Sequence, residues 1–67
     1  MPPRGLGGVL KAIREAKRLT QVDLARKAKV TQAYIAQLEA GAKRNPSLGT
    51  LRRIAKALGV PVERLLK

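Results

Sequence analysis

The strongest constraint on the fold is a pair of short segments, residues 20–28 and 31–40, that each carry the start signal of a helix. Thr20 and Thr31 suit the N-cap position because a threonine hydroxyl can accept a hydrogen bond from a free backbone N–H of the first turn. Gly41 follows the second segment, where a glycine can adopt the left-handed conformation that ends a helix. Only two residues separate the segments, so the second helix must turn sharply away from the first.

Apolar residues recur at helical spacing in both segments and predict a shared core; they are Leu24, Ala25, Ala28, Ile35 and Leu38. The face left outside on the second helix is small, polar and almost uncharged, and it consists of Gln32, Ala33, Tyr34, Ala36 and Gln37. The rest of the chain is crowded with lysine and arginine. This arrangement predicts a helix-turn-helix whose second helix, about residues 31–40, reads the major groove of DNA.

The rest of the chain predicts three more helices, so the expected fold class is all-α and the architecture a compact five-helix bundle. The expected ranges are residues 6–18, residues 47–58 and a short last helix that starts at Pro61. The buried positions of the two longer helices are expected to be Leu6, Val9, Leu10, Ile13, Ala16, Leu48, Leu51, Ile54, Ala55 and Leu58. Met1–Gly5 is expected to be a flexible arm, followed by one domain over residues 6–67.

The charge of the chain indicates an anionic partner. Fifteen lysines and arginines stand against four acidic residues, which gives a formal net charge of +11. Such an excess repels itself unless nucleic acid or an anionic membrane surface offsets it. Tyr34 is the only aromatic residue, which argues against single-stranded nucleic acid, because base stacking needs several aromatic side chains. Without histidine or cysteine the chain lacks the usual metal ligands, and we expect neither a metal nor a cofactor.

Two other classes of function fit the sequence poorly. No apolar run approaches the roughly 18 residues needed to span a bilayer, and a membrane-surface helix would carry Trp, Phe or Leu where this chain has Gln and Ala. An enzyme would have to use Glu15, Asp23, Glu39 or Glu63, which form no convincing carboxylate pair on a shared face. We therefore expect a protein that is neither an enzyme nor bound to a membrane.

One set of residues, in this order and spacing, resembles a known family; it comprises Arg14, Leu19, Thr20, Gln21, Leu24, Ala25, Val30, Thr31, Gln32, Ile35, Gln37, Leu38, Glu39, Gly41, Pro46, Leu51, Ile54, Ala55, Leu58, Gly59 and Val60. The set is similar to the phage repressor/Cro-type (xenobiotic-response-element type) helix-turn-helix family over about residues 6–66. The resemblance implies a lambda-repressor-like, five-helix domain that binds double-stranded DNA as a homodimer at a two-fold operator. It also implies a cytoplasmic regulator of transcription, usually a repressor, and we expect no small-molecule ligand.

The candidate base contacts are Gln32, Ala33, Ala36 and Gln37 on the outer face of the second helix. A glutamine amide can pair with both N6 and N7 of adenine, while a short alanine lets the helix sit deep and can meet a thymine methyl group. An alternative for Gln37 is a local hydrogen bond that only orients Gln32.

The candidate phosphate contacts are Gln21, Thr31, Tyr34, Lys43, Arg44 and Asn45. Gln21 lies in the first turn of its helix, where backbone N–H groups favour an anion, and the family uses the glutamine at this position in that way. The loop after the second helix should follow the DNA backbone. Tyr34 has two equally supported roles, which are a hydroxyl contact to phosphate and a roof over the gap between the two helices.

Two further expectations come from comparison with the family pattern. Arg14 and Glu39 match a pair that forms a partly buried salt bridge, for which we expect a structural role. Lys29 departs from the pattern, which has glycine in this turn because the backbone tends to adopt a positive φ there.

The C-terminal segment carries more apolar residues than a very short helix needs. Val60, Val62, Leu65 and Leu66 are therefore candidates for the dimer contact, together with Lys67. A rival interpretation keeps the DNA binding but makes the chain an antitoxin or controller-type protein whose main partner is another protein. The short arm is the only spare segment for such a partner, which favours the autonomous regulator.

Overall fold

The computed structural model describes residues 5–43 and 45–66, which form four α-helices and one 3₁₀ turn. The helices are α1 (Gly5–Ala16), α2 (Gln21–Ala28), α3 (Gln32–Glu39) and α4 (Leu48–Leu58), followed by the 3₁₀ turn η1 (Val62–Leu65). None of these residues lies in a strand. The expected all-α class is therefore confirmed.

The expected fifth helix is wrong in its type, because η1 is a single 3₁₀ turn. Its backbone bonds join residues three apart: the Arg64 N–H donates to the Pro61 carbonyl at 3.0 Å, and the Leu66 N–H donates to the Glu63 carbonyl at 3.2 Å. The segment has four residues, and 3₁₀ helices occur mostly in pieces of this length.

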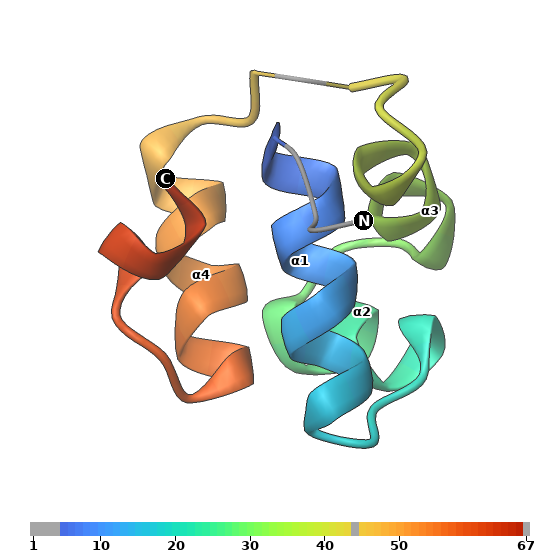
Figure 1. Cartoon of the computed structure of the whole chain (residues 1–67). Helices are drawn as coiled ribbons and strands as arrows, with labels where there is room; N and C mark the ends of the chain where they lie inside the picture. The colour runs from blue at the N-terminus through green and yellow to red at the C-terminus, as the bar shows by residue number, and fades with distance from the viewer. Residues whose placement is uncertain (1–4, 44, 67) are drawn as a thin grey trace.

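The four helices form a bundle in which α2 is the central contact. It packs against both α3 and α4, while α1 packs against α3, and η1 closes the bundle against α4 and α1. Figure 1 shows α3 and α4 on opposite sides of α1. Helix α3 is therefore held by both α2 and α1.

The core consists of twelve buried apolar residues from all five elements, namely Leu10, Ile13, Leu24, Ala25, Ala28, Ile35, Leu38, Leu51, Ile54, Ala55, Leu58 and Leu65. Two expected core positions are wrong: Ala16 is exposed, and Leu48 is half exposed. Both stand at an end of their helix, Ala16 as the last residue of α1 and Leu48 as the first of α4. Helical spacing predicts the side on which a residue lies, but not whether a neighbouring helix extends far enough to cover it.

Side-chain caps start three of the helices. Thr20 and Asp23 form a capping box, in which each side chain accepts a hydrogen bond of 3.0 Å from the backbone N–H of the other. The Thr31 hydroxyl accepts from the Tyr34 N–H at 3.0 Å, and the Ser47 hydroxyl accepts from the Thr50 N–H at 3.1 Å. These caps supply partners for backbone donors that the helix itself leaves free.

A residue in the left-handed conformation follows each α-helix within two positions of its end, and these residues are Arg18, Lys29, Gly41 and Gly59. After α2, the Val30 N–H reaches back to the Ala25 carbonyl at 2.9 Å, which is the bond pattern of a Schellman motif. The positive φ expected at Lys29 is confirmed at 60°. Helix α1 ends two residues before the expected position, because Arg18 also has a positive φ, of 59°.

Gly7 allows α1 to approach the end of α3 more closely than any other residue would. A Cβ atom at this position would lie 2.9 Å from the Glu39 carbonyl oxygen and still closer to the Leu38 carbonyl oxygen. The sequence suggested only that glycine weakens this helix turn. In the structure the missing side chain sets the distance between the two helices.

We predict that Gly7→Ala destabilises the fold, although alanine is the better helix former. The added methyl group would force the two helices apart, and overpacking of this kind costs about 1–3 kcal/mol. Gly49→Ala is the matched control, since its Cβ would meet nothing nearer than the Ser47 hydroxyl at 4.0 Å. Urea unfolding should show a loss for the first variant and a gain of up to ~1 kcal/mol for the second. Equal gains for both would contradict the close approach.

We predict that Lys29→Gly stabilises the protein by about 1 kcal/mol, because glycine adopts a positive φ without the clash that a Cβ atom causes. The matched control is Lys27→Gly, which places glycine in the last turn of α2 and should cost a similar amount. Thermal melts of both variants give the comparison. A loss of stability for Lys29→Gly as large as that for Lys27→Gly would rule out strain at this turn.

Candidate nucleic-acid interface

The outer face of α3 presents the expected small and polar side chains. Gln32, Ala33 and Gln37 are exposed, while Ala36 is half-buried. Opposite them, the same helix sends Ile35 and Leu38 completely into the core. The helix is thus fixed on one side and open to a partner on the other.

A continuous set of hydrogen bonds links this face to the interior of the molecule. Arg14 on α1 pairs with Glu39 at the end of α3, through Nε to Oε2 at 2.6 Å and Nη2 to Oε1 at 3.0 Å. The Gln21 amide donates to Glu39 Oε1 at 3.0 Å, and the Gln32 amide donates to Gln21 Oε1 at 3.4 Å. The structure therefore joins the expected salt bridge to two of the expected DNA contacts.

The ion pair lies away from solvent, with only 10% of the Arg14 side chain and 5% of the Glu39 side chain exposed. The remaining Arg14 nitrogen, Nη1, donates to the Leu19 carbonyl at 2.7 Å, so the guanidinium bonds three acceptor oxygens, two of Glu39 and one of Leu19. Burial opposes ionisation of Glu39, but hydrogen bonds from Arg14 and Gln21 and the nearby positive charge outweigh it and lower the pKa of the carboxyl. Hydrogen bonding to Glu39 raises the pKa of Arg14. Both groups therefore stay charged at neutral pH.

The sequence left open that Gln37 orients Gln32 through a local hydrogen bond, and in the structure Gln21 makes this bond instead. Its side chain, not that of Gln37, hydrogen-bonds Gln32 and favours one direction of that amide. Gln21 and Gln32 are the first residues of two successive helices, α2 and α3. This shared position was visible in the sequence, but the angle between the helices, which brings the two amides together, was not.

The loop after α3 lies beside the aromatic residue of the recognition helix. Tyr34 is half-buried and packs against the core, and the Lys43 ammonium lies 5.8 Å from the centre of its ring. Lys43 and Asn45 are exposed and, with Tyr34, line a depression of about 490 Å³. The ring thus packs within the protein beside this loop, and both roles expected for Tyr34, the roof between the two helices and the hydroxyl contact to phosphate, stay predictions. Arg44 lies outside the described residues.

The expected dimer residues have different environments. Leu65 is buried in the core of its own chain, Val60 and Val62 are half-buried, and Leu66 is 58% exposed. Leu65 therefore closes the bundle, which leaves the other three for an interface. Residues 1–4 of the expected arm and Lys67 lie outside the described residues, while Gly5, which was also expected in the arm, is the first residue of α1.

Two further features bear on the classes of function considered above. Among the described residues, no helix combines the length and apolar character that crossing a membrane requires. In the same part of the chain, no three potential acidic metal ligands come together.

Comparisons with known proteins agree with this geometry. A family model described as helix-turn-helix matches residues 10–65. The chain is 44% identical over 61 residues to the immunity repressor protein of Bacillus phage phi105. The aligned stretch covers 91% of this chain and 42% of the phage protein. The chain spans less than half the length of the curated relatives it matches.

Solved structures show the same arrangement of helices. The biofilm regulator SinR of Bacillus subtilis, in complex with DNA, has a TM-score of 0.89 and 32% identity, covering 92% of this chain and 98% of that one. The restriction-modification controller protein C.AhdI from Aeromonas hydrophila has a TM-score of 0.84 and 33% identity, covering 90% and 89%.

We predict that Arg14→Met lowers the melting temperature, because it leaves the buried Glu39 carboxylate without its main partner. Removing one member of a buried pair costs about 3–5 kcal/mol. The pKa of Glu39 is lower in the folded state than its ordinary value of 4.5. The ionised carboxylate therefore stabilises the fold fully at a pH above the ordinary pKa, and this stabilisation is lost as the pH falls through the pKa of the folded state. Thermal melts from pH 7 to pH 3 should therefore show the gap between wild type and variant narrowing at acid pH. A gap of constant size would mean that another contact is responsible.

Proposed function

The chain belongs to the helix-turn-helix family, and we propose that it is a sequence-specific, double-stranded DNA-binding regulator of transcription that acts as a repressor. The observation that carries this proposal is the uncharged Gln/Ala face of α3, held to the core through Gln21, Glu39 and Arg14. Such a face suits the base edges of the major groove, which present hydrogen-bond donors and acceptors and the thymine methyl group.

Sequence reading is assigned to α3. Gln32 and Gln37 would each pair with a base, preferably adenine, and Ala33 and Ala36 would let the helix lie deep in the groove. The bond from the Gln32 amide to Gln21, 3.4 Å long, favours one direction of that side chain. Less conformational freedom is lost when such a side chain binds, which favours tighter and more selective contact.

Positioning on the DNA backbone is assigned to the residues around α3. Gln21 and Thr31 lie at the starts of α2 and α3, where the helix dipole favours phosphate. Lys43 and Asn45 lie in the loop beyond the end of α3, and the formal charge of +11 adds general attraction. These contacts fix register and affinity but carry no sequence information.

A homodimer completes the proposal. Val60, Val62 and Leu66 lie at or next to η1, and Leu66 exposes a large apolar side chain that a second copy would cover. Two recognition helices related by a two-fold axis would read half-sites about 10 base pairs apart. A palindromic operator is the expected consequence.

A second candidate is a controller-type DNA-binding protein whose main partner is another protein. The likeness to the controller protein C.AhdI, which extends over 89% of that chain, supports it. Both candidate functions use α3 to bind DNA. They differ in that the second also requires a partner protein bound elsewhere on the surface.

The test is selection of bound sequences from a pool of random duplexes at two salt concentrations, since electrostatic binding weakens steeply with salt. A short palindrome that survives the higher salt is the expected result. Equal binding to all sequences, lost at the higher salt, would contradict base reading by α3 and favour the protein-partner candidate.

We predict that Gln32→Ala relaxes the preference at one base pair of each half-site by about 1–3 kcal/mol. Lys43→Ala is the control, because the loss of a phosphate contact should weaken binding to all sequences equally. Competition binding against a set of single-base variants of the selected operator measures both effects. The assignment fails if Gln32→Ala weakens every sequence by the same factor.

A further inference from the structure

A second cluster of positive charge lies where α2 ends and α4 passes it. Lys27, Lys29, Arg53 and Lys56 are all exposed and, with Ala57, line a depression of about 480 Å³. Two of these residues come from the end of α2 and two from α4. The cluster is thus assembled by the packing of two helices and is not a run of charge along the sequence.

One member of the cluster is held in place by the backbone. Arg53 Nε donates to the Ala28 carbonyl at 3.2 Å, a partner that the end of α2 would otherwise leave free. This bond uses one of the five N–H donors of the guanidinium and keeps its plane fixed at the depression. A positioned guanidinium is well suited to the oxygens of a phosphate group.

The acidic residues of the chain do not compensate this cluster. Glu39 pairs with Arg14, Asp23 closes the capping box at the other end of α2, and within the described residues no carboxylate lines the depression. Cations at a helix end are stabilised by the helix dipole, which accounts for Lys27 and Arg53. The helix dipole does not account for four cations around one depression, because these cations repel one another until an anion binds.

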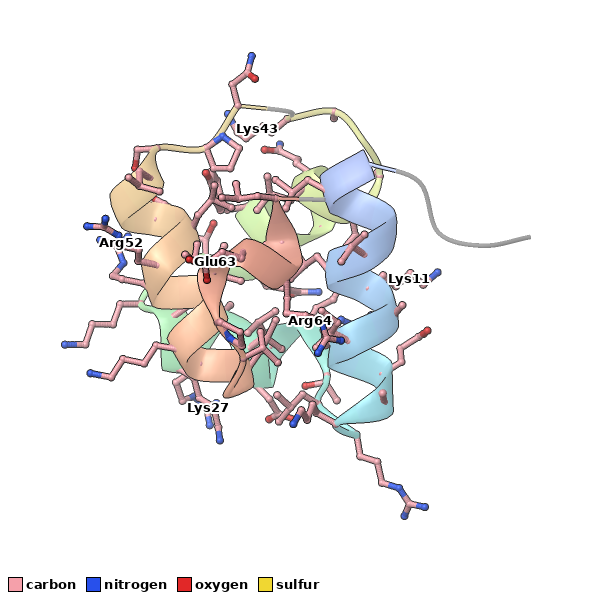
Figure 2. The ribbon with its side chains drawn as sticks, turned by 60° about the vertical axis from the view of Figure 1, so that its left-hand side comes forward. Lys11, Lys27, Lys43, Arg52, Glu63 and Arg64 are labelled. Atoms are coloured by element: carbon pink, nitrogen blue, oxygen red, sulfur yellow. The ribbon has the colours of Figure 1, made fainter. Side chains whose placement is uncertain are left out.

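The cluster lies apart from the proposed DNA-reading surface. Figure 2 shows Lys27 and Lys43 at opposite ends of the molecule, and Lys43 belongs to the loop that follows the recognition helix. A straight duplex bound along α3 and this loop would therefore contact Lys43 and leave Lys27 free.

We propose that Lys27, Lys29, Arg53 and Lys56 form a second DNA-binding surface, which takes the backbone phosphates of another duplex while α3 holds the first. The partner chemistry is the sugar–phosphate backbone, because the depression is lined by cations and one alanine, and most protein contacts to DNA of this kind go to phosphate oxygens. The bound protein would then join two DNA segments. For the first duplex, this inference rests on the function proposed above.

The test is a capture experiment with two duplexes of about 20 base pairs, roughly two helical turns. The full chain is bound to an immobilised duplex of the selected sequence, washed, and offered a fluorescent duplex of scrambled sequence. The test variant is Lys27→Gln with Lys56→Gln, because Arg53 caps α2 and Lys29 occupies a strained turn. The control variant, Lys11→Gln with Lys17→Gln, removes the same charge from exposed positions of α1 and the turn after it.

The test variant should bind the first duplex as the wild type does and should retain the fluorescent duplex on the order of tenfold less, with a salt slope shallower by about 0.9 per lost phosphate contact. The control variant should retain it. Equal capture of the fluorescent duplex by the two variants would overturn the proposal. Binding of both variants to polyglutamate is measured as well. If the test variant loses polyglutamate binding but still captures the duplex, the surface belongs to an acidic protein and the proposal is also overturned.

Failure of the function proposed for α3 would give a different result. In that case the immobilised duplex would show no sequence preference, and Gln32→Ala would change nothing. Capture of the scrambled duplex would still depend on Lys27 and Lys56. Melting temperatures of both double variants check that each is folded.

Discussion

The buried pair of Arg14 and Glu39 is the interaction on which the geometry of the α3 face proposed to read DNA depends. It joins the last turn of α1 to the last residue of α3, and Arg14 also holds the Leu19 carbonyl, which precedes α2. Two helices, α1 and α3, and the turn before α2 thus meet at one guanidinium. Burying a charged pair adds little net stability compared with an apolar contact, because both ions lose their hydration. Its value here is geometric, since the bidentate contact tolerates only one placement of α3 relative to α1.

Helix α3 needs this outside support because it is only eight residues long. Isolated helices of that length are not stable in water, and most of their stability in proteins comes from packing. The support is distributed along the whole helix: Thr31 caps its start, Ile35 and Leu38 anchor its inner side, and Gly7 lets α1 meet its last carbonyls. The outer face is then free to carry residues chosen for contact with a partner. A face of glutamine and alanine contributes nothing to the core.

The sequence predicted the features that are set by local chemistry. The caps at Thr20, Thr31 and Ser47 follow from side chains that compete for free backbone donors, and the left-handed turn at Lys29 follows from the short connection between two helices. Most of the core also followed, because helical spacing marks the inner side of each helix.

The features it could not predict depend on the distance and angle between helices. The role of Gly7 depends on a carbonyl thirty or so residues away, and the Gln21–Gln32 bond depends on the angle between α2 and α3. The cluster around Arg53 forms only because α4 crosses the end of α2. Helix ends caused the remaining differences: Arg18 stops α1 with a positive φ that its side chain does not favour, and Leu48 projects beyond the neighbouring helices.

The most direct test of the central claim, that the face of α3 held by this network reads DNA, is nuclear magnetic resonance of the ¹⁵N-labelled chain during titration with the selected duplex. The side-chain amide signals of Gln21, Gln32 and Gln37 report on the atoms assigned to phosphate and base contact. If α3 reads DNA, all three signals should shift strongly with the selected duplex, and the shifts of Gln32 and Gln37 should be lost when a scrambled duplex replaces it. Unchanged amide signals for Gln32 and Gln37, together with shifts confined to α1 or η1, would contradict DNA reading by α3.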